Sequence, residues 1–417
     1  MATAAALIWA CSPGSAVAAG AVIFAVGGAP SEVSFWEELL RDFQRQSGVR
    51  AALLRQPADT DQRRQGLVIA LNARRPEPDV FLMDVAWLGL FVASRWLEPL
   101  DDRVDAAPFF QRVIRLVDRH QGHLMALPVY LDCGLLYYRR DLLARFRLPG
   151  PPETWPELLS YARTVQEAMR PTNPRFYGFV WQGAQYEGLV CNFMEFSGSG
   201  GGFRRQGGRL RLDAAANRAA LNFMHDLIWR DRVSPPSTYT EMQEEQVRLY
   251  FQAGNALFER NWPYAWSLHQ RPGSKIRNKI GLAPLPAPAQ GRRVSALGGW
   301  HIGLSRFSER KPQALKFIRF VTSYDTQKQI MRRMGWNPGR EDLYAAPDIL
   351  KQAPHYRQLK AIFQHAVPRP LLPYYTQVSA IVQRYLNRVL ADRMSARNAL
   401  ESAQAEIDAL QRRYAAE

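Results

Sequence analysis

Three carboxylic acids stand where buried segments of the chain end. Glu32 follows a glycine-rich turn, Asp84 ends the apolar run at 80–83, and Asp132 follows the run at 127–130. In an open α/β sheet, ligands bind beyond the carboxyl ends of the strands. A carboxylate in that position can accept two hydrogen bonds from neighbouring hydroxyl groups. Each acid also has a structural alternative: Asp84 can cap the following helix, and Glu32 can lie in a solvated first turn.

Aromatic residues accompany these acids. Tyr130 lies two residues before Asp132, and the stretch 259–266 (ERNWPYAW) places three large aromatic side chains around a proline. An aromatic ring suits the apolar C–H face of a pyranose because it buries area without requiring hydrogen bonds. Arg63 supplies donors opposite the acids. The pattern favours a sugar site, although Tyr130 is equally compatible with a place in the core.

No motif for catalysis, a cofactor or a metal occurs. The chain has neither G-x-x-x-x-G-K-[ST] nor G-x-S-x-G, and the glycine cluster SGSGGG (197–202) lacks the lysine of a phosphate-binding loop. Seven scattered histidines and three cysteines show no metal spacing. At most one disulfide is available, between Cys133 and Cys191, and free buried thiols are expected in its place. We therefore expect no cofactor, no metal and no catalytic residue, with a glycoside-processing enzyme as the alternative from another class.

The composition is that of a soluble globular protein of two domains. The 417 residues are 47% apolar and 22% charged, and the net charge is +16. The arginines are scattered in ones and twos and form no basic block with interleaved aromatic residues. A nucleic-acid partner is therefore not expected.

The N-terminus resembles an export signal. Residues 4–10 are apolar, and Ala16-Val17-Ala18 has the small-x-small form that signal peptidase accepts, but basic residues are missing from its start. We expect 1–20 to be a leader segment, possibly truncated, with lipid anchoring through Cys11 as a further possibility.

The order of elements predicts an α/β fold. An apolar run at 21–26 leads through a glycine turn to a helix pattern that starts at Ser34, with Glu37 completing a capping box. A strand at 80–83, a second capping box at Thr154 and Glu157, and helices at 313–322 and 385–414 follow, the last broken near Met394.

Long segments of the chain resemble the extracellular solute-binding proteins of ABC sugar importers, specifically the trehalose/maltose-binding proteins. The likeness runs from about Val22 to the C-terminus. It is carried by FAVGGAP (24–30), EPDVFLMDVAWLG (77–89), GLLYYRRDLL (134–143), PPETWPEL (151–158), GFVWQGAQYEGLVCNF (178–193), ALFERNWPYAW (256–266), LGGWHIGLS (297–305), GWNPGR (335–340) and AVPRPLLPYY (366–375).

The resemblance implies a periplasmic-binding-protein type II fold, in which two α/β lobes flank a ligand cleft. The N-lobe is expected at 21–128 with 299–337 and the C-lobe at 129–298 with 338–417. The three crossings between lobes are expected near 127–132, 298–300 and 336–338. A monomer is expected to capture a disaccharide by lobe closure and deliver it to ABC permease subunits in the membrane, in a periplasmic or other extracytoplasmic location.

The resemblance also assigns the ligand contacts. It places Glu32, Arg63, Asp84 and Trp300 on the N-lobe side of the sugar and Tyr130 and Asp132 at the first crossing. Trp262 is the stacking platform on the opposite lobe, Gly298 and Gly299 allow close approach of the backbone, and Arg369 and Tyr374 are further candidates. Trp266 is expected in the core.

Three positions depart from the family pattern: Cys133 replaces a small residue, Asn192 replaces an acid, and SGSGGG replaces a more aromatic stretch. The last two can alter the second sugar subsite. Trehalose and maltose are therefore the leading ligands, and sucrose and glucosylglycerol are the alternatives.

Overall fold

The computed structural model describes residues 20–212, 214–288 and 291–416. The chain divides into two compact units. Unit 1 comprises Met1–Leu82 and Gly303–Phe320, and unit 2 comprises Met83–Ile302 and Val321–Glu417. Over the described ranges, the helices all fall short of the length and apolar character needed to cross a membrane.

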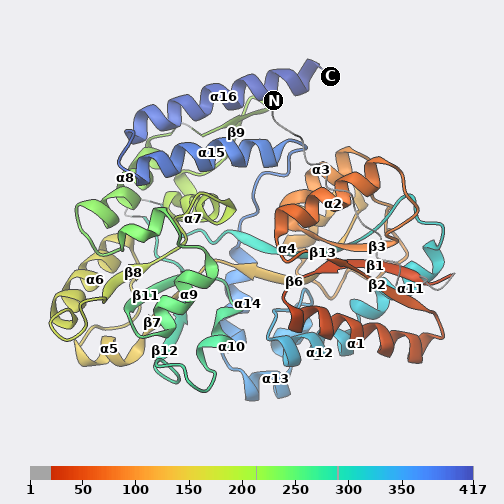
Figure 1. Ribbon diagram of the computed structural model, residues 1–417, viewed down its shortest axis with the longest axis horizontal. Helices are drawn as coiled ribbons and strands as arrows, with labels where there is room; N and C mark the ends of the chain where they lie inside the picture. The colour runs from red at the N-terminus through yellow and green to blue at the C-terminus, as the bar shows by residue number, and fades with distance from the viewer. Residues whose placement is uncertain (1–19, 213, 289–290, 417) are drawn as a thin grey trace, which may run out of the picture. The chain divides into compact units, whose positions relative to one another are not determined.

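Unit 1 is built on parallel strands. Strand β1 (Val22–Gly27) pairs with β2 (Ala51–Gln56) along its whole length, and Phe24 of β1 is in register with Val80 of β3 (Val80–Asp84). Helices α1 (Pro30–Ser47) and α2 (Thr60–Asn72) connect these strands and pack on β2 (Figure 1). A strand, a helix and a parallel strand form the α/β unit that the sequence predicts.

Aromatic side chains fill the core of unit 1. The ring of Phe24 lies 5.3 Å from that of Trp36 and 5.0 Å from that of Phe317, which belongs to α11 (Lys311–Val321). Phe43 packs edge-on against Phe317 at 5.1 Å. The amphipathic face of α1 therefore faces β1, as the spacing of its apolar residues predicts.

Helix α1 begins four residues before the predicted start. Pro30 occupies its first turn, and the Glu32 carboxylate accepts a hydrogen bond from the Ala29 N–H at 2.7 Å. Proline suits the first turn because the N–H it lacks has no partner there. The prediction that Ser34 and Glu37 cap this helix was therefore wrong: Glu32 supplies the carboxylate.

Unit 2 contains a four-stranded sheet. Its order is β12 (Ile280–Ala283), β7 (Leu135–Arg139), β11 (Ala256–Asn261) and β8 (Tyr177–Val180). Helix α6 (Trp155–Met169) packs on β8, and Thr154 caps it by accepting the Glu157 N–H. This confirms the second capping box. Strand β11 carries the sequence that ends at Asn261, directly before Trp262.

Two further strands of unit 2 form an antiparallel pair. In β6 (Leu127–Cys133) and β13 (Leu297–Leu304), Asp132 faces Gly298 and Tyr130 faces Trp300. The register shifts between Trp300 and His301, which marks a β-bulge. Bulges re-aim the side chains beside them, and this one directly follows Trp300.

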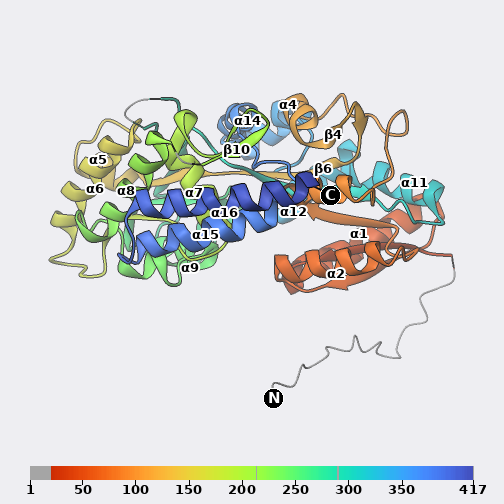
Figure 2. The same cartoon turned by 90° about the horizontal axis from the view of Figure 1, so that it is seen from above.

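The C-terminal residues of unit 2 form a helical pair. Helices α15 (Tyr375–Leu390) and α16 (Ala396–Ala416) run side by side (Figures 1 and 2). They are separated at 391–395, which confirms the predicted break near Met394, although α15 begins ten residues earlier than the pattern at Tyr385 indicated.

The remaining elements complete the described chain. They are η1 (Val85–Trp87), α3 (Leu88–Ala93), α4 (Gln111–Val113), the π-helix η2 (Ile114–Asp118), β4 (Arg119–His120), β5 (His123–Leu124), α5 (Arg140–Arg145), α7 (Glu187–Ser197), η3 (Gly198–Gly200), β9 (Arg204–Gln206), β10 (Arg209–Arg211), α8 (Ala215–Trp229), η4 (Pro236–Tyr239), α9 (Glu244–Gln252), α10 (Ala265–His269), α12 (Tyr324–Met334), η5 (Asp342–Ala345), α13 (Pro347–Gln352) and α14 (Tyr356–His365).

The three remaining expectations have different outcomes. Cys133 and Cys191 are free and buried, as predicted. Residues 1–19 of the predicted leader, Cys11 among them, lie outside the described residues. The lobe boundaries at 21–128 with 299–337 and 129–298 with 338–417 stay a prediction.

Candidate functional site

In unit 1, Glu32 lies in the first turn of α1, which follows β1, and Arg63 lies in the first turn of α2, which follows β2. Arg63 is almost fully buried, and its guanidinium donates to the carbonyl oxygens of Pro57 at 2.8 Å and Ala58 at 3.2 Å. A Cβ at Gly27 would lie 2.7 Å from Arg63 Nε, so glycine is required for this approach. Burial raises the pKa of the Glu32 carboxyl, although the Ala29 N–H and the Arg63 guanidinium oppose the rise. The turns thus bring a carboxylate and a guanidinium together.

In unit 2, Asp132 and Trp262 meet at Gly298. A Cβ on Gly298 would lie 3.3 Å from Asp132 Cβ and 3.4 Å from Trp262 Cζ3. The absence of that side chain lets the indole lie against β13 beside the carboxylate. Gly298 was predicted to let the backbone approach a ligand; in the structure it makes room for the aromatic residue predicted to hold one.

Polar contacts hold Trp262 in place through its backbone and its indole. Its backbone N–H donates to Asn261 Oδ1 at 2.8 Å, its carbonyl accepts from the Tyr137 hydroxyl at 3.0 Å, and its Nε1 donates to Glu244 at 3.2 Å. Trp262 is only partly buried. An anchored aromatic ring that keeps part of its surface accessible can serve as a stacking face.

Arg260 lies over the Trp262 ring. Its guanidinium carbon is 4.0 Å from the ring centroid, and two of its nitrogens bind the Glu195 carboxylate at 2.6 and 2.7 Å. Both charged side chains are buried. A bidentate pair of this kind is rigid because both hydrogen bonds fix the same plane, and Arg260 therefore supports one face of the indole.

The Asp132 carboxyl is unusual in its acidity. Burial and the negative charges of Asp84 and Glu244 raise its pKa to about 7, and the Arg260 guanidinium opposes the rise. Like charges close to one another disfavour ionisation of both. Asp132 can therefore both accept and donate a hydrogen bond near neutral pH.

Asp84 belongs to a network around Arg369. One oxygen of Asp84 accepts the Ala86 N–H at 2.8 Å, which is the predicted capping role, and also accepts from Arg369 at 3.1 Å. The other end of Arg369 binds Glu187 at 3.0 Å, and Glu187 accepts from the Tyr375 hydroxyl at 2.5 Å. The carboxylate at the end of β3 is thus tied to α7 and α15.

The remaining predicted residues are two aromatic side chains that contact tryptophan rings and one glycine that its backbone conformation requires. Tyr130 stacks on Trp336 with ring centroids 4.5 Å apart, and Trp300 meets the edge of Trp87 at 5.4 Å. Gly299 has a φ of 131°, and a Cβ there would lie 2.5 Å from the Tyr130 carbonyl oxygen. Glycine at 299 is therefore required by the backbone.

The structure places the predicted residues in two sets. Unit 1 holds Glu32 and Arg63; unit 2 holds Asp84, Tyr130, Asp132, Trp262, Gly298, Gly299, Trp300 and Arg369. Tyr374 stacks on Tyr414 at 4.6 Å. In unit 2, the Trp262 ring and the Asp132 side chain both lie against Gly298, a combination that can bind hydroxyl groups and an apolar sugar face.

Sequence reasoning missed the supporting residues Glu195 and Glu244 and left the role of Glu187 undecided. Their partners lie between 18 and 182 positions away, so no local pattern identifies them. Trp266, predicted in the core, is half-buried and lines a cavity. Among the described residues, no cluster of three His, Cys, Asp or Glu side chains has a geometry that could hold a metal.

Comparison with known proteins identifies the class to which this site belongs. Residues 29–328 match the model of the bacterial extracellular solute-binding protein family. The chain belongs to this family: it is a solute-binding protein outside the cytoplasm, not an enzyme.

Three similar proteins represent the relatives. A probable ABC transporter-binding protein of Deinococcus radiodurans is 33% identical over 370 residues, covering 87% of each chain. A maltotriose-binding protein of Pyrococcus abyssi is 24% identical over 370 residues, covering 87% of this chain and 76% of the relative. The structure of maltose-bound MalE3 from T. maritima matches with a TM-score of 0.85 and 36% identity, covering 93% of this chain and 99% of that one. The two-lobed α/β fold of that structure is therefore the fold of this chain.

Proposed function

We propose that the chain is the substrate-binding component of an ABC sugar importer and that it captures an α-glucoside disaccharide, with trehalose and maltose as the leading ligands. The support from relatives is the maltose bound in the T. maritima structure and the similarity to the maltotriose-binding protein of P. abyssi. The chemical support is the set of residues in unit 2 that combines an aromatic face with carboxylates.

The observation that carries the proposal is that the side chains of Trp262 and Asp132 both lie against Gly298. The indole and the carboxylate occupy adjacent positions against a strand without a side chain between them. A pyranose presents an apolar face and hydroxyl groups at its edge, so a ring beside a hydrogen-bonding carboxyl group matches both. Glu32 and Arg63 of unit 1 are proposed to contribute further hydrogen bonds.

Hinge closure is the proposed mechanism. A ligand that contacts both units only in the closed state binds that state more tightly and shifts the population toward it. The closed form then docks on permease subunits of the membrane. Export through the leader at 1–20, with lipid anchoring at Cys11, would place the protein where such a component acts.

Isothermal titration calorimetry of the purified protein tests the ligand class. The panel is trehalose, maltose, sucrose, glucosylglycerol and glucose, with mannitol as a polyol control. We expect one disaccharide to bind with a dissociation constant in the micromolar range or below, about −8 kcal/mol or better. The absence of binding by every disaccharide in the panel would overturn the proposal.

Sucrose and glucosylglycerol are the second candidates. Asn192 and the stretch 197–202 differ from the pattern of trehalose/maltose-binding proteins, and Asn192 is fully buried with its amide donating to Gln182 and Gly188. Preference for either compound over trehalose in the same titrations would assign the second subsite to a smaller or different unit.

A further inference from the structure

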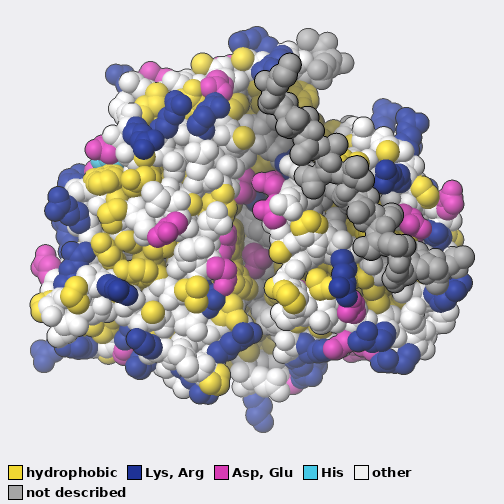
Figure 3. Space-filling model, in the orientation of Figure 1, with side chains coloured by type: hydrophobic (Ala, Val, Ile, Leu, Met, Phe, Trp, Pro, Cys, Tyr) yellow, Lys and Arg dark blue, Asp and Glu magenta, His cyan; other side chains and the backbone are white. Residues whose placement is uncertain are grey.

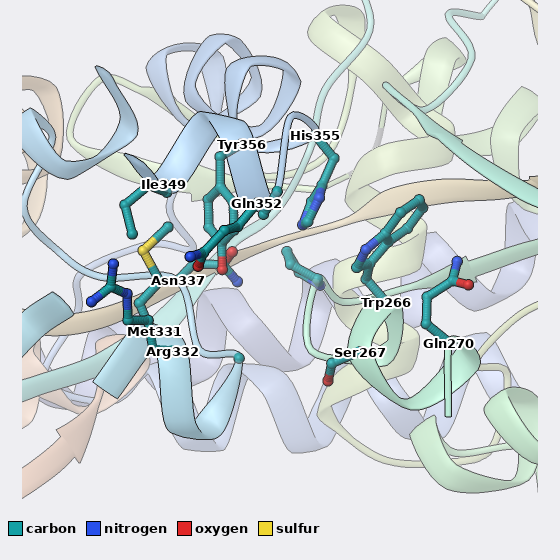
Figure 4. Close-up of a pocket in the computed structure, with 13 residues that line it drawn as sticks. Trp266, Ser267, Gln270, Met331, Arg332, Asn337, Ile349, Gln352, His355 and Tyr356 are labelled. Carbon is teal, nitrogen blue, oxygen red and sulfur yellow. The ribbon is translucent and has the colours of Figure 1, made fainter. Parts of the chain in front are cut away.

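A cavity lies within unit 2, beside the segment that follows Trp262. Its volume is about 620 Å³. Trp266 and Gln270 border one side, Met331 and Arg332 of α12 another, and His355 and Tyr356 a third (Figure 4). Among the residues predicted to bind the ligand, none lines this cavity.

One wall of the cavity is aromatic and uncharged. The Trp266 indole and the His355 imidazole lie 4.7 Å apart, 30° from parallel, and both are half-buried. Burial lowers the pKa of His355 to about 4, so its imidazole is neutral at pH 7. Flat uncharged rings of this kind suit an apolar face of a small molecule.

A buried amide supplies a polar group without a partner. Asn337 is 2% exposed and lines the cavity, and within the described part of the chain its Nδ2 has no hydrogen-bond acceptor. An unsatisfied buried donor is destabilising, and a bound acceptor would remove that cost. Ser267 and Gln352 add further polar atoms to the lining.

The charges exclude a cationic ligand. The lining residues include neither Asp nor Glu. Arg332 is the one charged residue among them, and it shares the Asp348 carboxylate, at 2.6 Å, with Lys328, at 2.8 Å. Since the Arg332–Asp348 pair is exposed, it exerts little attraction on an anion. The cavity therefore offers aromatic faces, amides and a hydroxyl to an uncharged molecule.

We propose that this cavity is a second binding site, which takes one uncharged polyhydroxy molecule of the size of a sugar or polyol. Trp266 and His355 provide the apolar wall, and the Asn337 amide donates to a hydroxyl oxygen. Its volume is within the range typical of small-molecule sites. This site does not depend on the proposed role of Trp262.

Fluorine NMR of protein labelled with 5-fluorotryptophan tests the site. The Trp266 resonance is assigned by its loss in Trp266→Phe. Glucose, trehalose and glycerol are then titrated separately into the wild type and into Trp262→Ala, to about 100 mM, which detects binding in the millimolar range. We expect at least one probe to shift the Trp266 resonance saturably in both proteins.

Two variants separate specific binding from other causes. Asn337→Leu removes the donor at similar volume, and Ala353→Phe fills the cavity; each should weaken the saturable shift by about tenfold or more. Circular dichroism and thermal melts check that both variants fold, and data from one folded variant are sufficient.

Three results would overturn the proposal. The first is no shift with any probe, and the second is a shift unaffected in a folded variant. The third is a shift whose midpoint rises tenfold or more in Trp262→Ala, since it would report binding at the other site. Failure of the disaccharide titrations would leave this test intact, because its readout is local to Trp266.

Discussion

At the scale of single residues, Trp262 combines a firm anchorage with an accessible surface. Asn261, which holds its backbone N–H, is itself held by Glu259 at 2.6 Å, and Glu259 binds the buried His269 at 2.7 Å. The chain of contacts runs through the stretch 259–269 and ends on the backbone N–H of Trp262. Such anchorage lowers the entropy that ligand binding would otherwise cost, because the ring is already in place.

Replacing Trp262 by Ala should reduce disaccharide affinity. The loss of aromatic area predicts about 1–3 kcal/mol in calorimetry, or roughly tenfold to a hundredfold in the dissociation constant. Trp229→Ala is the matched control, because Trp229 is also half-buried but donates to the Leu390 carbonyl, away from the predicted contacts. Equal affinity of the Trp262 variant and the wild type would remove the indole from the site.

The raised pKa of Asp132 predicts pH-dependent binding. Sugar hydroxyl groups donate best to an ionised carboxylate, so disaccharide affinity should increase as the pH rises through about 7. Calorimetry between pH 5.5 and 8.5 measures this slope. Asp132→Asn should bind more weakly and show a flatter profile; an unchanged slope would assign the pH dependence to another group.

The same carboxyl predicts a change in stability. The folded protein holds its proton more tightly than the unfolded chain, where the pKa is near 3.8. The associated stability is complete below about pH 4 and is lost as the pH rises through 7. Urea unfolding without ligand should therefore show that Asp132→Asn gains roughly 1–3 kcal/mol relative to the wild type between pH 4 and 8. A constant difference across this range would contradict the assignment.

At the scale of elements, Arg369 joins segments distant in the sequence. Its two carboxylate partners, Asp84 and Glu187, lie 285 and 182 positions away. The segment before α15 is thereby tied to the end of β3 and to the first turn of α7. A guanidinium with a carboxylate at each end has fixed orientation, since both partners lie along its plane.

Two substitutions distinguish ligand contact from structural pairing. Asp84→Asn and Glu187→Gln each weaken one side of Arg369, so each should cost roughly 1–3 kcal/mol in urea unfolding. Only Asp84 is a predicted ligand contact. Disaccharide affinity should therefore fall in Asp84→Asn and change little in Glu187→Gln, and equal losses would make the whole network responsible for binding.

The success of prediction differed among the elements for physical reasons. The strand at Val80, the helix capped by Thr154 and the break near Met394 follow from local patterns, and all three were predicted. The start of α1 was missed because Ser34 and Glu37 fit a capping box, whereas Ala29, which precedes the helix, has no side-chain oxygen to mark its start. The supports of Trp262 and Arg369 were missed because they depend on tertiary contacts.

At the scale of the whole molecule, the chain passes between two compact units three times. The family match explains why the fold class was predictable, since the motifs that carry the resemblance are distributed along most of the chain. Lys and Arg side chains are dispersed among acidic and apolar ones over the face that Figure 3 shows, as are the arginines along the sequence. The identity of the ligand was less predictable, since it depends on a few side chains at one subsite.

Hinge closure should be visible in solution. Small-angle X-ray scattering of the monomer with and without saturating trehalose or maltose should show a smaller radius of gyration with the sugar that binds, because closure brings mass together. Trp262→Ala at the same concentration should show a smaller change. An unchanged scattering profile with proven binding would exclude large-scale closure.

The two buried thiols provide a measure of how often unit 2 opens. Burial raises the pKa of Cys133 well above its usual value and that of Cys191 to about 12, so neither is a reactive thiolate in the folded state. A thiol reagent can reach them only through transient opening. In a Cys11→Ser variant, their labelling rate therefore reports local unfolding, and a bound sugar that stabilises the unit should slow it.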